Sequence, residues 1–105
     1  MEDCIFCKII RKEIPSKFEY EDEDYVVFHD IHPRARVHLL LIPKKHISSL
    51  KEVEIVDEML IGKLLYLTAQ IAQKNNLSDY NVSINTGKKA GQEVFHLHLH
   101  LKSAD

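Results

Sequence analysis

Three histidines near the end of the chain alternate with leucines, in the run Val94-Phe95-His96-Leu97-His98-Leu99-His100-Leu101. Side chains alternate across a β-strand, so this run predicts a strand with the imidazoles on one face and the leucines on the other. An imidazole titrates near neutral pH and can act as a nucleophile, a proton donor or a metal ligand. The central ring, His98, is the natural nucleophile, because the two flanking rings can orient it or bind an anion.

Two other interpretations compete with catalysis. A solvated strand face can carry histidines without a function, although such faces more often carry Thr, Lys, Glu or Ser. A single metal ion could also bind the row. Residues two apart on a strand lie about 6.6 Å apart and residues four apart about 13 Å, whereas imidazole–zinc bonds are about 2 Å long. His96 and His100 could share an ion only if fully stretched toward each other, so separate roles are favoured.

The two cysteines, Cys4 and Cys7, are spaced to share one face of a short helix over residues 4–11, which Asp3 can cap and Pro15 ends. Three interpretations stay open: two buried thiols packed as small hydrophobic groups, a redox pair, and half of a zinc site that needs two further ligands. The redox pair is the weakest, because the strand that precedes such motifs is missing.

The segment Gly91–His100 resembles the signature of the histidine triad family, and specifically its Hint branch of nucleoside phosphoramidate hydrolases. Further similar segments follow in the family's order along nearly the whole chain: Ile5–Ile10, Glu13–Pro15, Phe28–Ile31, His38–His46 and Asn85–Gly87. The resemblance implies an enzyme that hydrolyses purine nucleoside 5′-phosphoramidates, such as AMP joined to an amine. It also implies a homodimer.

The resemblance implies a structural zinc site as well. In zinc-containing members, two cysteines and two histidines match Cys4, Cys7, His46 and His96. A closed Cys2His2 site of this kind would tie the N-terminal helix to the loop after Pro43 and to the last strand. It would leave His98 and His100 free for chemistry.

The nucleotide-binding positions that the resemblance implies are Asp30, Ile31, Asn85, Gly91, Gln92, Glu93, His98 and His100. From the residues alone, Asp30 fits a turn residue that bonds its own backbone better than a ligand for a ribose diol. The matching aspartate of the family contacts the nucleoside, with Ile31 then lining the base pocket. Gly91 to Glu93 match the family's phosphate-contacting segment, in a loop whose glycines let backbone N–H groups turn toward an anion.

The implied catalytic residues are His98, His100, His38 and Gln92. His98 would attack phosphorus, expel the leaving group and hold the nucleoside monophosphate covalently until water releases it. His100, Gln92 and loop amides would bind the nonbridging oxygens, with no metal needed at phosphorus. His38 would have a supporting role, although a histidine inside an apolar run is more often a core residue.

Two further functions stay open: a dinucleoside polyphosphate hydrolase that uses the same His98, and a zinc-stabilised nucleotide-binding module without turnover. The chain also departs from the family's pattern. Glu93 stands where close relatives have a serine, Lys102 follows Leu101 where the pattern has an apolar residue, and the sequence ends five residues after His100. A carboxylate beside a phosphate is repulsive unless it points away or binds a cationic leaving group.

The 105 residues predict a single domain, 1–105, with one core that needs no disulfide. A net charge of −2, 45% hydrophobic residues and scattered Lys and Arg argue against a nucleic-acid partner. No stretch reaches the roughly 20 apolar residues of a membrane span, and the acidic start lacks the basic segment of a signal peptide. We therefore expect a cytoplasmic protein that does not bind membranes.

Five strands and two helices must position these residues. Alternating or continuously apolar runs predict strands over 17–20, 24–29, 37–42, 80–85 and 94–101. Apolar residues at three- and four-residue intervals predict one long helix over 53–75. Together they predict an α+β fold, with an antiparallel sheet of about five strands, the long helix on one face and the cysteine helix at the edge. We expect the long helix and the 80–85 strand to form the dimer interface.

Overall fold

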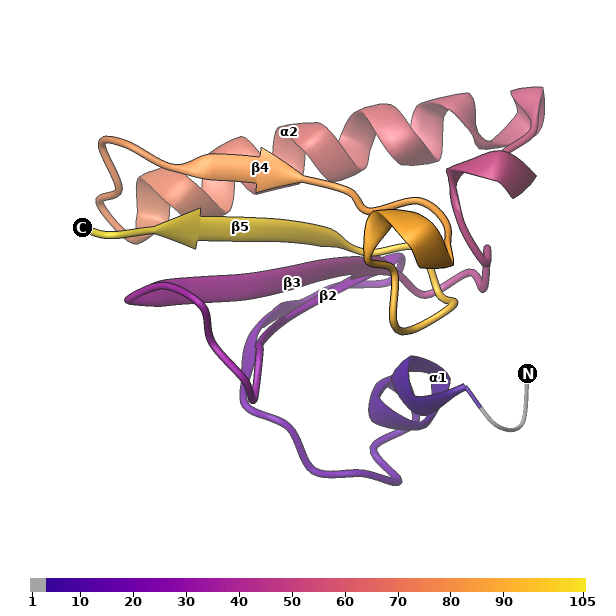
Figure 1. Cartoon of the computed structure of the whole chain (residues 1–105), viewed down its shortest axis with the longest axis horizontal. Coiled ribbons are helices and arrows are strands. Elements are labelled where there is room, and N and C mark those ends of the chain that lie inside the picture. Colours follow the sequence, from indigo (N-terminus) through magenta and orange to yellow (C-terminus); the bar gives the residue numbers. More distant parts are fainter. Residues whose placement is uncertain (1–3) are drawn as a thin grey trace.

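The computed structural model describes residues 4–105 and has the predicted α+β architecture (Figure 1). Its helices and strands are α1 (Ile5–Ile10), β1 (Phe18–Glu21), β2 (Tyr25–His29), β3 (Val37–Pro43), α2 (Glu58–Lys74), β4 (Asn81–Ser83) and β5 (Leu99–Ser103). Short 3-10 turns occupy Leu50–Glu52, Ile55–Asp57 and Lys88–Ala90. The five strands pair antiparallel in the order β1-β2-β3-β5-β4.

Both faces of the sheet are covered, which explains why β3 is apolar from Leu39 to Pro43. Leu39 and Leu41 point into a core that α2 closes, whereas Leu40 and Ile42 point into a second core that includes Phe6 of α1. Figure 1 shows α2 along one face of the sheet and α1 on the opposite side. The expectation that the cysteine helix lies at the sheet edge was therefore wrong, because its apolar residues cover part of the second face.

The last strand begins later than the sequence predicts. Leu99 is the first residue of β5 and pairs with Leu41 of β3. Pro43, two residues beyond Leu41, has no amide hydrogen to continue the ladder. The backbone N–H of Leu97 instead donates to the carbonyl of Ile47, at 2.6 Å. Residues 94–98 consequently leave the sheet, and the predicted strand over 94–101 was wrong in its first half.

The helix boundaries also differ from the prediction at their N-terminal ends. Helix α2 begins at Glu58 instead of residue 53, because the chain first makes a 3-10 turn in which the backbone N–H of Glu54 donates to Asp57. Asp3, the expected cap of α1, lies outside the described residues. Cys4 caps this helix, its Sγ accepting from the N–H of Cys7 at 3.3 Å.

Membrane-spanning helices are absent from residues 4–105, since none there is both long and apolar enough.

Candidate active site and metal centre

The histidine row divides between two sites. His100 lies within β5, on the face opposite the buried Leu99 and Leu101, whereas His96 and His98 precede the strand. The ring of His96 lies among the two cysteines and His46. His98 and His100 line a cavity. The three histidines therefore do not bind one common metal ion, and they do not lie together on a solvated strand face.

The first site brings together Cys4, Cys7, His46 and His96, whose ligand atoms all lie within 4.8 Å of one another. Nδ1 of His96 lies 3.4 Å from Sγ of Cys4, 3.6 Å from Sγ of Cys7 and 3.2 Å from Nδ1 of His46. Tetrahedral zinc with ordinary bond lengths separates two nitrogens by about 3.4 Å, and a nitrogen from a sulfur by about 3.6 Å. The four side chains could hold a metal ion, and their geometry is compatible with zinc.

A backbone carbonyl fixes the tautomer of His96 that a metal ligand needs. Its Nε2 lies 2.8 Å from the carbonyl oxygen of Pro43, so Nε2 carries the proton and Nδ1 presents a lone pair to the cluster. The ring is fully buried, and this burial lowers the pKa of His96 to about 4. Burial also raises the pKa of Cys7 to about 11, with the neighbouring Cys4 adding to the effect. Two close thiols of this kind need a cation to become thiolates.

The second site is a cavity of about 300 Å³ on the α1 side of β3 and β5. Such a volume is at the lower end of the range for small-molecule sites. Apolar residues of α1, β2 and the following loop line one part: Ile5, Phe6, Ile9, Phe28 and Ile31. Polar and charged side chains line the other part: Arg34, Asn85, Glu93, His98, His100 and Lys102.

His98 is oriented as a nucleophile requires. Its Nδ1 lies 2.7 Å from the carbonyl oxygen of His96, so the neutral ring donates through Nδ1 and keeps the Nε2 lone pair free. Phe6 packs edge-on against the ring, with centroids 5.0 Å apart and planes at 85°. Burial lowers the pKa of His98, which favours the neutral form at pH 7, although the carbonyl of His96 and the charge of Asp30 oppose the shift.

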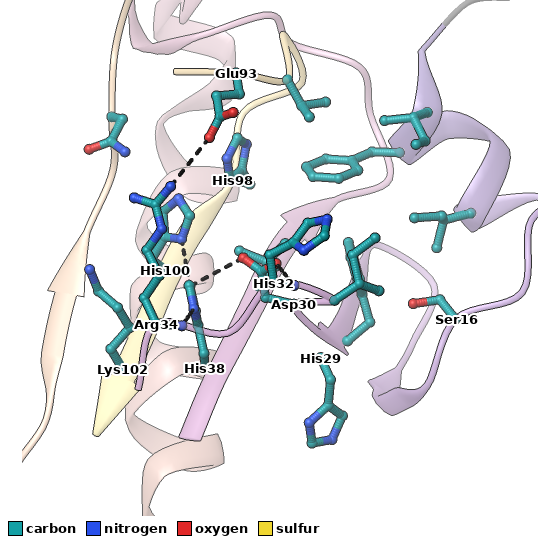
Figure 2. A pocket seen from close by; sticks show the side chains of 18 of the residues that line it. Ser16, His29, Asp30, His32, Arg34, His38, Glu93, His98, His100 and Lys102 are labelled. Carbon is teal, nitrogen blue, oxygen red and sulfur yellow. Dashed lines mark hydrogen bonds and ion pairs between the residues drawn. The ribbon is translucent and has the colours of Figure 1, made fainter. Parts of the chain in front are cut away.

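His38 and His100 form a hydrogen-bonded pair beside His98 (Figure 2). Nδ1 of His38 accepts from the backbone N–H of Arg34 at 3.0 Å, so the neutral ring carries its proton on Nε2. That nitrogen lies 2.9 Å from Nδ1 of His100 and 3.4 Å from Oδ2 of Asp30. His38 therefore donates to His100, which leaves the proton of His100 on its own Nε2.

The same three residues, Asp30, His38 and His100, place possible metal-ligand atoms within 4.8 Å of one another. A metal on Nε2 of His38 would force the proton onto Nδ1, directly against the N–H of Arg34. We therefore interpret this group as a hydrogen-bonded network instead of a metal site. Burial lowers the pKa of His38 and, helped by the neighbouring His98, lowers that of His100 to about 4.

Asp30 uses its two carboxylate oxygens differently. Oδ1 accepts from the backbone N–H of His32 at 2.9 Å, which is the turn bond expected from the residue type alone. Oδ2 lies near His38, in the cavity wall. Ile31, next in the chain, is 80% exposed and lines the same cavity. The turn interpretation of Asp30 therefore does not compete with a ligand-binding one.

Gln92 has a different place from the one expected. Its side chain is 3% exposed, and its Nε2 donates to the carbonyls of Ser48 at 2.7 Å and Val94 at 3.1 Å. Its Oε1 accepts from the N–H of Gly87 at 2.8 Å. Both amide hydrogens are thus used, and the expectation that Gln92 donates to a phosphate is not met in this structure. The residue instead holds the loop in shape.

The neighbours of Gln92 do line the cavity. Gly91 has a left-handed backbone, with φ of 95°, and Asn85 lies against it. Glu93 is ion-paired with Arg34, at 3.7 Å between Oε1 and Nη2. The charge of Arg34 therefore offsets the repulsion expected between the Glu93 carboxylate and an anionic ligand.

Comparisons with known proteins agree with this geometry. The family model described as "Scavenger mRNA decapping enzyme C-term binding" matches residues 3–105. Protein HitA of Neisseria gonorrhoeae is 50% identical over 102 residues, which are 96% of this chain and 95% of that protein. A HIT family hydrolase from Legionella pneumophila Philadelphia 1 superposes with a TM-score of 0.94 at 41% identity, covering 98% of this chain and 94% of that one. This chain belongs to the histidine triad family.

Other members of the histidine triad family are similarly close. The purine nucleoside phosphoramidase of Escherichia coli strain K12 is 39% identical over 102 residues, which are 95% of this chain and 86% of that enzyme. A histidine triad protein from Clostridium difficile has a TM-score of 0.95 at 36% identity, covering all of this chain and 93% of that one.

Several residues that line the cavity of this histidine triad protein were not predicted as site residues, among them Phe6, Arg34 and Lys102. Phe6 carried only an apolar helix signal. Arg34 follows a turn-forming proline and has the pattern of a solvated surface residue. The alternation of β5 could have assigned Lys102 to the face of His100.

The depressed pKa of His100 predicts a pH-dependent stability. The folded chain keeps this ring neutral down to about pH 4, whereas the unfolded chain protonates it near pH 6.5. The unfolded state therefore binds more protons between these values, and the free energy of unfolding falls as the pH falls through this window.

Replacing His100 by Gln, which can still accept from His38, removes one of the groups responsible. Urea unfolding should then show a shallower loss of stability from pH 6.5 to 4, by up to about 1.4 kcal/mol per pH unit for one proton. Equal slopes for the two proteins would contradict this assignment.

Proposed function

We propose that this protein hydrolyses purine nucleoside 5′-phosphoramidates through a covalent nucleotidyl intermediate on His98. The main support is the hydrogen bond from Nδ1 of His98 to the His96 carbonyl, which leaves Nε2 unprotonated inside the cavity. The relationship to the purine nucleoside phosphoramidase of E. coli supports the substrate class.

The reaction consumes one water. In the first step, the Nε2 lone pair of His98 forms a bond to the α-phosphorus, and the P–N bond breaks with its electron pair leaving on the amine, which takes a proton from solvent. In the second step, a water oxygen bonds to phosphorus and releases its proton to solvent, and the bond to Nε2 breaks. The products are the amine and the nucleoside monophosphate, and His98 regains its lone pair.

Charge on the phosphoryl oxygens is stabilised by fixed donors beside the nucleophile. Nε2–H of His100 is held in place by the bond that Nδ1 accepts from His38. Asn85 and the backbone at Gly91 line the same part of the cavity. Pre-oriented donors of this kind supply most of the catalysis in phosphoryl transfer. Gln92 acts indirectly, by fixing the loop that carries Gly91.

The nucleoside occupies the apolar part of the cavity. Ile31 and the α1 side chains cover the base, which accounts for a large apolar side chain left mostly exposed. The Oδ2 oxygen of Asp30 accepts from the ribose hydroxyls, because only Oδ1 is used by the turn.

The metal of the four-residue cluster is zinc in this proposal, held by Cys4, Cys7, His46 and His96. When bound, zinc supplies structural cross-linking and no chemistry at phosphorus. A cytoplasmic location fits these ligands, because a reducing compartment keeps both free cysteines available to a metal.

A homodimer completes the proposal. Strand β4 is at the edge of the sheet and pairs only with β5 among the described residues. Large apolar side chains are exposed on this strand and on α2, including Val82, Met59 and Tyr66. A second copy that pairs along β4 and α2 would cover both the free strand edge and these side chains.

Covalent catalysis predicts an adenylyl adduct. Wild-type protein quenched while it hydrolyses an adenosine 5′-phosphoramidate should show the adduct by mass spectrometry, on a peptide that contains His98. His98→Ala should show neither adduct nor turnover, with its fold checked by circular dichroism. Turnover that survives in the variant would exclude His98 as the nucleophile. Faster turnover of a dinucleoside polyphosphate would shift the substrate class, and tight AMP binding without turnover would indicate a binding module.

Metal analysis tests the zinc site. Purified wild-type protein should contain about one zinc per chain, as expected for a single four-ligand site. Cys4→Ser should lose it, because a three-ligand site with a weak hydroxyl binds zinc poorly. His32→Ala is the control, since His32 lies outside the cluster and should keep the metal. Wild-type protein without zinc would refute the assignment.

Sedimentation tests the dimer. Wild type should sediment as a dimer, and Tyr66→Glu should shift it toward monomer, because a charge would be buried against apolar side chains. Lys17→Glu adds negative charge at an exposed position next to β1, at the opposite edge of the sheet, and should remain dimeric. A monomeric wild type at micromolar concentration would contradict the proposal.

A further inference from the structure

The cavity has a polar side whose use is not explained by the nucleotide alone. Figure 2 shows Arg34 and Lys102 on one side of His98 and α1 on the other, with Glu93 next to His98 and pointing toward Arg34. If the base lies against α1 and the α-phosphate at His98, the group attached to phosphorus extends toward the polar side. This step rests on the proposed function.

Arg34 and Glu93 are opposite charges at the mouth of this side. Their atoms are 3.7 Å apart and the side chains are 73% and 81% exposed, so the pair is longer than a hydrogen bond and open to water. Among residues 4–105, neither side chain has another ion pair or hydrogen bond. A pair of this kind contributes little to stability and is easily opened by a ligand.

We infer that Arg34 and Glu93 form a subsite for a zwitterionic leaving group, one that carries both a carboxylate and an ammonium group. A purely anionic group on Arg34 would lie beside the Glu93 carboxylate, and a purely cationic group on Glu93 would lie beside the guanidinium. A zwitterion pairs with both and replaces one weak ion pair with two. The guanidinium can hold a carboxylate through two parallel N–H donors.

An amino acid joined to phosphorus through a side-chain amine has this chemistry, because its α-carboxylate and α-ammonium groups stay free. Glu93 then has a use that a serine would not have. Its carboxylate binds the cationic part of the leaving group, while Arg34 shields the phosphate from its charge.

Binding of stable analogues tests the inference independently of turnover. Four AMP analogues with a P–CH2 bond in place of P–N would carry chains of equal length that end in a zwitterion, a carboxylate, an ammonium or a neutral amide. Calorimetry should show wild type binding the zwitterion about tenfold more tightly than the neutral analogue, as two charge-assisted contacts in water would give. The preference should shrink as the salt concentration rises.

Arg34→Gln and Glu93→Gln should each reduce this preference to below about threefold. Arg36→Gln is the matched control, because Arg36 is exposed in the same loop and does not line the cavity. It should keep the full preference. The same four groups are then joined to AMP through P–N bonds, and hydrolysis of these compounds by wild type is measured.

Equal binding of the four analogues by wild type would overturn the inference, as would a preference that survives in Arg34→Gln. Tighter binding of the simple carboxylate than of the zwitterion would also overturn it. A retained preference for the zwitterion with no hydrolysis of the P–N compounds would support the subsite and refute the proposed hydrolase function.

Discussion

The hydrogen bonds between the backbone and the imidazole rings determine what each histidine can do. A neutral imidazole has one proton and two nitrogens, and the nitrogen without the proton is the one that binds a metal or attacks an electrophile. The carbonyl of Pro43 accepts a hydrogen bond from Nε2–H of His96, so the unprotonated Nδ1 of this ring faces the cysteines. The carbonyl of His96 accepts a hydrogen bond from Nδ1–H of His98, so the unprotonated nitrogen of this ring is Nε2. The two rings, which are two residues apart, therefore have opposite bare nitrogens and different chemistry.

The sheet supplies these fixed backbone groups and the burial that makes them effective. Strand β3 ends at Pro43, where the missing N–H stops the pairing with β5 and leaves the chain before Leu99 free to bend. Because of this bend, the ring of His96 points to the cysteine cluster and the ring of His98 lines the cavity. Burial then lowers the pKa of His98 and His100, so both rings are neutral at pH 7. A neutral ring is a requirement for attack on phosphorus.

Local patterns in the sequence were sufficient for the fold and for part of the site. The apolar run of β3 and the periodicity of α2 depend on neighbours along the chain, and both were predicted. The start of β5 was not, because it depends on the lack of an N–H on Pro43, which lies far away in the sequence. Gln92 was misplaced for a similar reason: a loop amide can face a ligand or the backbone, and the carbonyl of Ser48 decides between them. The ion pair between Arg34 and Glu93 could not be predicted, because no pattern in the sequence links the two residues.

His96 connects the two sites through a single residue. Its ring belongs to the four-residue cluster, and its carbonyl oxygen accepts a hydrogen bond from Nδ1 of His98 at 2.7 Å. Helix α1 makes a second connection, because Phe6 lies between the two cysteines in sequence and packs on His98. Whatever fixes the cluster therefore also fixes the carbonyl that selects the tautomer of His98 and the aromatic ring beside it. In the proposed mechanism, the four-residue cluster contributes to catalysis only by positioning His98, as outer-shell groups position a metal ligand.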